Sequence, residues 1–323
     1  MEEKRLNKEI FKPKTFYFLS GFISGLSLLV IIGCVLLSDD KNIVDEDFPQ
    51  GYKIISPGIP DKLDFCGEPV PLENFEVFER IDREFLVNTY WHSATVLSFK
   101  KASRWFPVIE GILKANNVPE DFKYLALIES GLSNVISPLG ATGFWQFMEG
   151  AAIKYGLEVD KEIDERYHVE KSTEAACKYF KEAYGKFGSW ALAAASYNMG
   201  IPGIEEQMER QKTNNYYNLV LNEETSRFIA RIIAMKEIFQ NPKKFGYDLK
   251  EEEFYTPLVF KEVQIKGPVN SFADFAISKG INYKILKMYN PWLRENYLTN
   301  TGGKAYSIKI PEVGSIKIIP EKE

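Results

Sequence analysis

Apolar residues at helical spacing dominate the sequence from residue 74 to about residue 245. Phe75, Phe78, Ile81, Phe85 and Leu86 recur mostly at steps of three or four, which predicts a long helix over residues 74–99. Further helical patterns lie over 102–114, 119–129, 172–186, 190–198 and 223–240. Strand patterns are almost absent from this region. The predicted fold class is therefore mainly α, with this region built as a helical bundle.

The starts of several of these helices carry recognisable signals. Pro119, followed by two acidic residues, suits the first turn of the helix that ends at Glu129. Ser172 and Ser189 are predicted N-caps of the two helices that follow.

An uncharged and mostly apolar segment lies near the N-terminus, over residues 15–38. As a helix it would reach about 36 Å, enough to cross a hydrocarbon core of about 30 Å. Basic residues precede it and acidic residues follow it. The positive-inside rule then predicts a cytoplasmic segment over 1–14, a membrane anchor over 15–38, and export of everything beyond. Residues 39–72 are rich in Asp, Pro and Gly, and are predicted to form a periplasmic tether.

Two other interpretations of the apolar segment stay open. It is long for a cleaved signal peptide and has no clear small-residue cleavage site. Ile31-Ile32-Gly33-Cys34 resembles a loose bacterial lipobox with Cys34 as the lipidated residue, although the apolar run continues beyond it. All three interpretations place the bulk of the chain outside the cytoplasmic membrane.

Charge and composition argue against several classes of function. The net charge of −5 gives no support for nucleic-acid binding. No glycine-rich phosphate loop is present, and His92 and His168 stand too far apart in sequence to suggest a zinc site or a Ser-His-Asp triad. No metal and no cofactor is expected. Three cysteines do not make a disulfide framework, and spacing alone cannot support a Cys66–Cys177 bond.

Glu129 is the residue that points most directly to chemistry. It ends an apolar helical run, beside Leu125, Leu127 and Ile128, and Gly131 stops the helix. Apolar neighbours and the negative end of the helix dipole both disfavour a carboxylate, so we expect the pKa of Glu129 to be raised. A raised pKa is what a general acid working near neutral pH requires.

Three short motifs follow one another in the order of a known family. Glu129-Ser130 is followed by Gly143-Phe144-Trp145-Gln146-Phe147, and later by Ala195-Ser196-Tyr197-Asn198-Met199-Gly200. This ordered set resembles the lytic transglycosylases of the soluble and membrane-bound D type, which share a goose-lysozyme-like fold. The resemblance covers roughly residues 73–245, and the predicted catalytic domain spans 73–247. Family members usually carry Leu where Phe144 stands and Pro where Glu149 stands.

The resemblance implies cleavage of the β-1,4 bond between N-acetylmuramic acid and N-acetylglucosamine in peptidoglycan. Glu129 would protonate the leaving oxygen and then act as base on the muramic C6 hydroxyl, which closes on C1 and leaves a 1,6-anhydro end. Because the nucleophile comes from the substrate, the second carboxylate of an ordinary glycosidase is not required. This agrees with the absence of acidic residues from 131–147.

The same resemblance assigns substrate contacts to matched positions in the second motif. Ser130 would contact the sugar or orient the loop, and its alternative is a helix-end hydroxyl bonded to backbone. Gln146 can donate to and accept from an N-acetyl group or sugar hydroxyls. Phe144 and Trp145 would offer faces to pyranose rings, with core packing as their alternative.

In the third motif, Tyr197 would hydrogen-bond Glu129 and help to keep it neutral, or else be a buried tyrosine bonded to backbone. Asn198 would contact the substrate or brace the loop. Two alternative functions also stay open. One is a lysozyme-type muramidase, for which Glu149 would be the spare carboxylate. The other is a non-catalytic cell-wall-binding scaffold.

The C-terminal residues 255–315 have a different character. A β-branched stretch over 256–266, two helical patterns over 271–293 and a closing strand over 305–311 resemble a LysM module. Asn290-Pro291 and Ile308–Pro311 match that family, whereas Gly267-Pro268-Val269 replaces its usual turn. A degenerate LysM-like module is predicted, with a packing appendage of the catalytic domain as the alternative.

Overall fold

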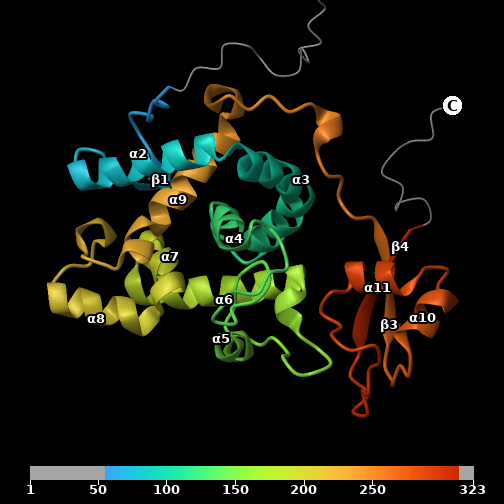
Figure 1. Ribbon diagram of the computed structural model, residues 1–323. Helices are drawn as coiled ribbons and strands as arrows, with labels where there is room; N and C mark the ends of the chain where they lie inside the picture. Colours follow the sequence, from blue (N-terminus) through green and yellow to red (C-terminus); the bar gives the residue numbers. More distant parts are fainter. Residues whose placement is uncertain (1–54, 313–323) are drawn as a thin grey trace, which may run out of the picture. The chain divides into compact units, whose positions relative to one another are not determined.

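The computed structural model describes residues 55–312 (Figure 1). The predicted anchor over 15–38, Cys34 and the first part of the predicted tether lie outside the described residues. Within residues 55–312, no helix combines the length and the apolarity needed to cross a membrane. Cys66 and Cys177 are both free thiols, so no disulfide joins them.

Helix follows helix through most of the described chain, as predicted (Figure 1). The helices are α2 (Phe75–Tyr90), α3 (His92–Ala115), α4 (Phe122–Ser130), α5 (Glu149–Lys154), α6 (Val169–Phe187), α7 (Trp190–Met199), α8 (Ile201–Gln211) and α9 (Glu223–Gln240). A hairpin of two short strands, β1 (Asp64–Phe65) and β2 (Glu68–Pro69), precedes them. The prediction of a mainly helical fold is confirmed.

The long helix predicted over 74–99 is in fact two helices, which separate at Trp91. Two carbonyls near the end of α2 are occupied by side chains from elsewhere. The Tyr247 hydroxyl donates to the carbonyl oxygen of Thr89, and the Thr95 hydroxyl donates to that of Asn88. The contact from Tyr247 depends on the tertiary fold, so the apolar spacing alone did not reveal the break.

The predicted N-caps have different outcomes. The Ser189 side chain accepts from the backbone N–H of Leu192 and caps α7, as predicted. The prediction for Ser172 is wrong, because α6 begins earlier, at Val169. The Ser172 hydroxyl lies inside the first turn and donates to the Val169 carbonyl.

The helix α7 lies at the centre of the core. Residues 191–196 are all buried, which is the pattern of a helix covered on every side. Helices α6, α8 and α9 pack against it, and its alanines allow them to approach closely. Helix α4 packs between α3 and α9 and is locked at its start by Phe122, whose ring lies 4.0 Å from that of Phe180.

The C-terminal module has the predicted order of strand, helix, helix and strand. It consists of β3 (Phe260–Ile265), α10 (Phe272–Ser278), α11 (Tyr283–Tyr289) and β4 (Tyr306–Pro311). The two strands pair antiparallel, with Phe260 opposite Pro311 and Ile265 opposite Tyr306. Inward residues of β4 alternate with less buried ones and pack on the two helices.

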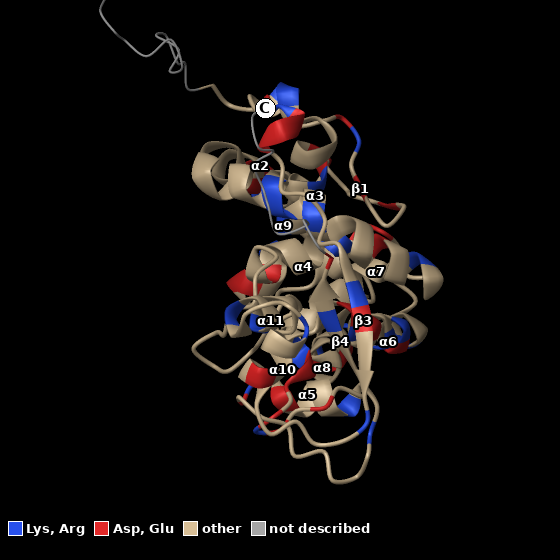
Figure 2. Ribbon diagram, turned by 90° about the vertical axis from the view of Figure 1, so that its right-hand side faces the viewer, with Lys and Arg blue, Asp and Glu red and all other residues tan. Residues whose placement is uncertain are grey.

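Charged residues of both signs are interspersed over the helices and the two strands of the module (Figure 2). This mixture agrees with the small net charge of −5.

Candidate active site

Glu129 lies in the last turn of α4. The preceding residues Leu125, Ala126 and Leu127 are buried, and the helix ends at Gly131, as predicted. Gly131 has a φ of 58°, and its N–H donates to the Leu127 carbonyl at 2.8 Å. Leu132 also has a positive φ of 50°. Two successive left-handed residues turn the chain sharply away just after Glu129 and Ser130.

The pKa of Glu129 is raised to about 7, first by burial and further by the nearby carboxylate of Glu224. The positive charge of Arg231 opposes this rise. The Arg231 guanidinium donates to the Ile128 carbonyl at 3.1 Å, which holds it beside the end of α4. The predicted rise in the pKa of Glu129 is confirmed, with burial as its main cause.

Ser130 connects the end of α4 to the loop over 131–147, which we call the site loop. Its hydroxyl donates to the Phe144 carbonyl at 2.8 Å and contacts the Ala126 carbonyl at 3.2 Å. Of the two roles expected for Ser130, the structure agrees with the second, in which the hydroxyl bonds to backbone and orients the site loop. The hydroxyl hydrogen is used in the bond to the Phe144 carbonyl.

Gln146 has a left-handed backbone conformation, and its side-chain amide uses both of its hydrogens in hydrogen bonds. Its φ is 49°, and its side-chain nitrogen donates to the carbonyls of Gly143 at 2.7 Å and Val135 at 3.1 Å. These two bonds use both amide hydrogens. The side-chain oxygen has no hydrogen bond within residues 55–312, so it is the acceptor that Gln146 can offer a ligand.

The aromatic residues of this motif are buried, which corrects the expectation that they face a sugar. Phe144 is 3% exposed and Trp145 is 0% exposed. The Trp145 indole N–H donates to the Thr173 hydroxyl at 2.9 Å, and the Phe144 ring meets Trp105 edge to face. Both rings pack in the core, which was the alternative role expected for them, since the site loop turns both rings inward.

Tyr197 lies close to Glu129 but does not donate to it. Its hydroxyl donates to the Trp145 carbonyl at 2.7 Å, so the predicted hydrogen bond to Glu129 is replaced by one to backbone. Burial, and after it the charge of Glu129, raise the pKa of the Tyr197 phenol well above its usual value. The phenol hydroxyl has a single hydrogen, and because it donates this hydrogen to the site loop it has none to donate to Glu129.

Asn198 braces α7 against the start of α9. Its side-chain nitrogen donates to the Glu224 carboxylate at 3.0 Å, and its oxygen accepts from the Thr225 hydroxyl at 2.6 Å. Asn198 thus holds the second carboxylate of the site in place. Glu149, the spare carboxylate expected from the sequence, is instead exposed at the first residue of α5. The carboxylate whose negative charge raises the pKa of Glu129 belongs to Glu224.

A cavity of about 330 Å³ opens beside the end of α4, within the range of ordinary ligand sites, about 300–1,000 Å³. Ile128, Gly131 and Arg231 line one side of it, and α3 lines the other. Trp91, also in its lining, is 63% exposed and has an accessible indole. The Lys101 ammonium donates to the Gly131 carbonyl at 3.1 Å and steadies the turn.

The structure therefore brings together Glu129, Ser130, Gln146, Tyr197 and Asn198 from three separated motifs. Sequence reasoning missed Glu224 and Arg231, and it did not single out Trp91, which lines the cavity at the end of α4. Glu224 and Arg231 lie on α9, about a hundred residues after Glu129, and no spacing in the sequence indicates that α9 packs on α4.

Comparison with known proteins shows which families two segments of this chain resemble. Residues 106–220 match the family model of the transglycosylase SLT domain. Residues 261–314 match that of the soluble lytic transglycosylase C-terminal LysM-like domain. The two matches confirm the resemblance to the lytic transglycosylase class that was seen in the motifs.

Individual relatives agree with this class. The chain is 27% identical over 247 residues to membrane-bound lytic murein transglycosylase D of Escherichia coli strain K12, covering 74% of this chain and 53% of the relative. The same values hold for the protein of that name from Escherichia coli O6:H1. The chain spans about half the length of the curated relatives that it matches.

Proposed function

We propose that this protein is a lytic transglycosylase that cleaves the β-1,4 bond between N-acetylmuramic acid and N-acetylglucosamine in peptidoglycan. The observation that carries the proposal is the half-buried carboxyl group of Glu129, whose pKa, raised by desolvation to about 7, lets it hold a proton at neutral pH. The match of residues 106–220 to the SLT domain and the relatives named murein transglycosylase support the choice of substrate.

In the proposed mechanism, protonated Glu129 donates its proton to the glycosidic oxygen as the bond from C1 to that oxygen breaks. The Glu129 carboxylate then removes the proton from the C6 hydroxyl, whose oxygen bonds to C1 and completes the 1,6-anhydro ring. No water is consumed, and the enzyme returns to its protonated state. Arg231, whose charge favours the ionised form of Glu129, would stabilise the intermediate stage.

Substrate contacts are proposed from groups that the site leaves available. The exposed Trp91 indole would stack on a sugar ring, in the role first expected for Trp145. The side-chain oxygen of Gln146 would accept from an N-acetyl N–H. Ser130, Tyr197 and Asn198 would act by holding the site loop, Trp145 and Glu224 in place.

A lysozyme-type muramidase is the second candidate, because Glu224 lies close enough to raise the pKa of Glu129. In a hydrolase, Glu224 would activate a water molecule on the other side of the sugar. Against this role, its carboxylate already accepts from Asn198.

Mass spectrometry of muropeptides distinguishes the candidates. The purified full-length protein, beside a Glu129→Gln variant, is incubated with purified peptidoglycan. Products lighter by one water than those of a muramidase, and absent with the variant, are expected. Hydrated reducing ends that disappear in a Glu224→Gln variant would identify a hydrolase. Binding without products from either protein would point to a scaffold.

The location proposed for this activity is the cell envelope, where peptidoglycan lies. The named relatives are membrane-bound, and the predicted anchor over 15–38 would keep this protein at a membrane with its SLT domain in the periplasm.

A further inference from the structure

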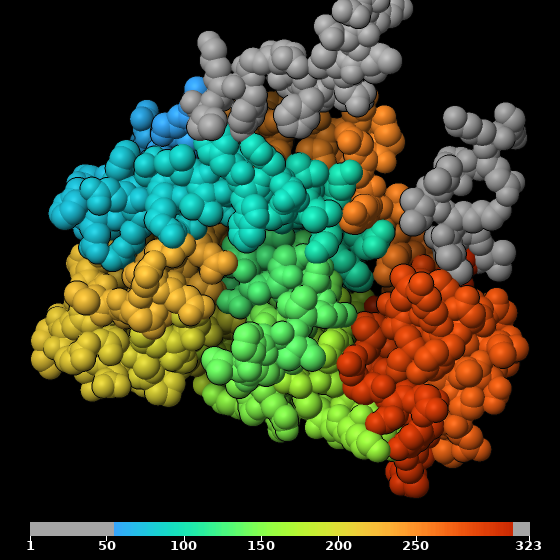
Figure 3. Space-filling model, in the orientation of Figure 1, coloured from blue at the N-terminus to red at the C-terminus, as the bar shows by residue number. Residues whose placement is uncertain are grey.

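The segment that leads into α6 and includes its first two residues, residues 158–170, binds the C-terminal module, and we call it the docking loop. Its side chains Ile163 and Tyr167 are buried in the apolar core of the module, together with Trp292 and Leu293. The backbone N–H of Asp164 donates to the Trp292 carbonyl at 2.9 Å. In Figure 3 the orange and red module lies against the yellow-green surface that contains this loop.

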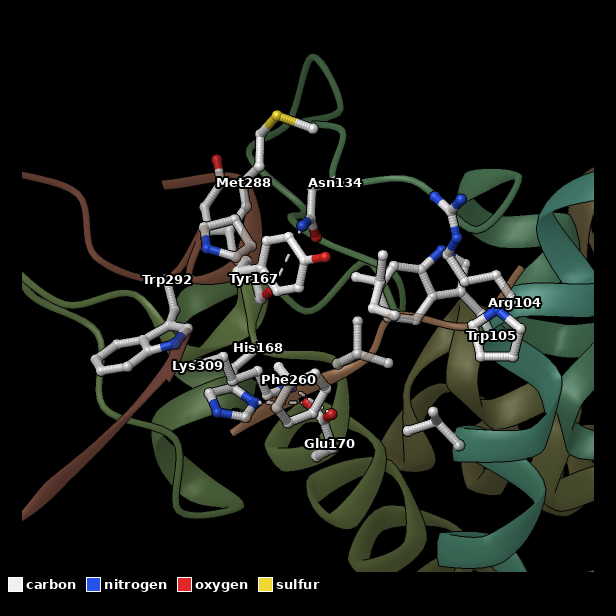
Figure 4. A pocket seen from close by; sticks show the side chains of 16 residues that line it. Arg104, Trp105, Asn134, Tyr167, His168, Glu170, Phe260, Met288, Trp292 and Lys309 are labelled. Carbon is white, nitrogen blue, oxygen red and sulfur yellow. Dashed lines mark hydrogen bonds and ion pairs between the residues drawn. The ribbon is translucent and has the colours of Figure 1, made fainter. Parts of the chain in front are cut away.

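Charged contacts reinforce this attachment at both ends of the docking loop. The Glu158 carboxylate accepts from the Lys304 ammonium at 2.6 Å and from the Tyr306 hydroxyl at 2.9 Å. At the other end, Lys309 of β4 forms an ion pair with Glu170. Figure 4 shows Glu170 and Lys309 at the cavity between the module and α3, which Tyr167 and Trp292 also line.

The other side of the docking loop holds the site loop. The Arg166 guanidinium donates to the Gly140 carbonyl at 3.2 Å and to the Phe147 carbonyl at 3.4 Å. The Arg166 carbonyl lies so close to Gly143 that a Cβ there would stand 2.0 Å from its oxygen. The Asn134 side chain donates to the Tyr167 carbonyl at 3.4 Å. Neighbouring residues of one segment therefore contact both the module and the site loop.

Tyr167 is the point where the two sets of contacts meet. Its ring lies in the core of the module, with the Arg294 guanidinium 4.0 Å from its centre, while its carbonyl faces the site loop. Arg166 is held in turn by its ion pair with Asp164, at 2.8 Å. These contacts form a continuous path from the module to the site loop, and closely packed protein interiors transmit strain.

We propose that the C-terminal module positions the Glu129 site: bound to the docking loop, it holds Arg166 and Tyr167 in place, and these hold the site loop that carries Gln146. Arg166 is thus a positioning residue. The catalytic consequence rests on the proposed transglycosylase function, whereas the structural consequence does not. A module that serves only as a glycan anchor would leave the site loop unaffected.

Hydrogen–deuterium exchange of the full-length protein tests the structural consequence without any assay of activity. The double variant Lys304→Glu/Lys309→Glu places like charges opposite Glu158 and Glu170. Faster exchange is expected first in residues 158–170 and also in residues 131–147. Adding Glu158→Lys and Glu170→Lys reverses the charges on both sides of each pair and should restore slow exchange in both segments. Lys284→Glu, the same change at an exposed module position outside these contacts, is the matched control.

Either of two results overturns the proposal. Unchanged exchange in residues 158–170 would show that these contacts do not hold the docking loop. Faster exchange there with none in residues 131–147 would show that the docking loop does not hold the site loop.

Kinetics on a short soluble glycan fragment test the catalytic consequence. Arg166→Ala is expected to lower kcat by roughly 10- to 100-fold with little change in KM, because misplaced groups slow chemistry more than binding. Arg166→Lys should recover part of the loss, since it keeps the charge. An unchanged kcat for Arg166→Ala would overturn the positioning role. An inactive parent protein would instead refute the proposed function, and the exchange result would still stand.

Discussion

For single residues, the clearest case is Glu129, whose environment sets its pKa and thereby affects the stability of the folded protein. Burial raises its pKa from 4.5 to about 7, so the folded protein holds this proton more tightly than the unfolded chain does. The stability contributed by the protonated form is complete below pH 4.5 and is lost as the pH rises through about 7. The folded protein is therefore less stable at neutral and higher pH than it would be if the pKa of Glu129 stayed at its ordinary value.

We expect Glu129→Gln to abolish turnover and yet to stabilise the protein at pH 8. The gain should be about 1–2 kcal/mol, because a half-buried and poorly solvated negative charge is removed, and it should shrink towards zero near pH 4.5. Urea unfolding of both proteins across this range measures it. A gain that is the same at every pH would mean that ionisation of Glu129 is not its cause.

Trp91 offers an exposed aromatic face to the cavity at the end of α4. Trp91→Ala is expected to raise KM for glycan by roughly 2- to 10-fold, the value of one aromatic contact, while Trp91→Phe retains most of the binding. Phe75→Ala, another exposed aromatic position that does not line the cavity, is the control. Equal effects of the Trp91 and Phe75 substitutions would exclude a specific stacking role.

Gly143 illustrates a position where only glycine fits. Gly143→Ala combines a positive φ of 82° with a clash against the Arg166 carbonyl, whereas Gly140→Ala has a similar φ of 86° and open space around it. Left-handed backbone alone costs about 1–2 kcal/mol. Thermal unfolding should show the Gly143 variant clearly less stable than the Gly140 variant. Equal losses would mean that the clash is relieved at no cost.

At the scale of elements, the helices are held by contacts that their own sequences do not contain. The clearest case is α7, the helix that carries Tyr197 and Asn198. Its first N–H groups are satisfied from outside, because the Glu68 carboxylate on β2 accepts from the backbone N–H of Ala191 at 3.0 Å and from the Ser189 hydroxyl at 2.9 Å. A negative charge at a helix N-terminus is favourable.

Glu68→Ala should therefore destabilise the protein by about 1–2 kcal/mol, the usual value of a lost helix cap. Glu73→Ala, a neighbouring exposed glutamate that caps no helix, serves as the matched control. Chemical denaturation of the two variants makes the comparison. A loss of the same size in both would show that net charge, and not the cap, is responsible.

At the scale of the whole molecule, the predicted anchor over 15–38 remains a prediction, because it lies outside the described residues. Removal of residues 1–38 is expected to release the protein from the membrane fraction. Cys34→Ala should leave the protein there if the apolar helix itself is the anchor. Release by Cys34→Ala alone would support lipidation. A soluble full-length protein would contradict both and favour a cleaved signal peptide.

Properties that depend on near neighbours in the chain could be predicted from the amino-acid sequence. Apolar spacing indicates the helices, Gly131 ends α4, and a lone glutamate after Leu127 and Ile128 predicts a raised pKa. The order of three motifs indicates the family, and the strand–helix–helix–strand pattern indicates the module.

Properties that depend on segments distant in the chain became visible only in the folded protein. The sequence does not indicate that Trp91 is exposed and Trp145 is buried, because burial depends on what packs against each ring. Glu224, and not Glu149, faces Glu129 because α9 packs on α4. The attachment of the module to the docking loop arises in the same way, from side chains that meet only after the chain has folded.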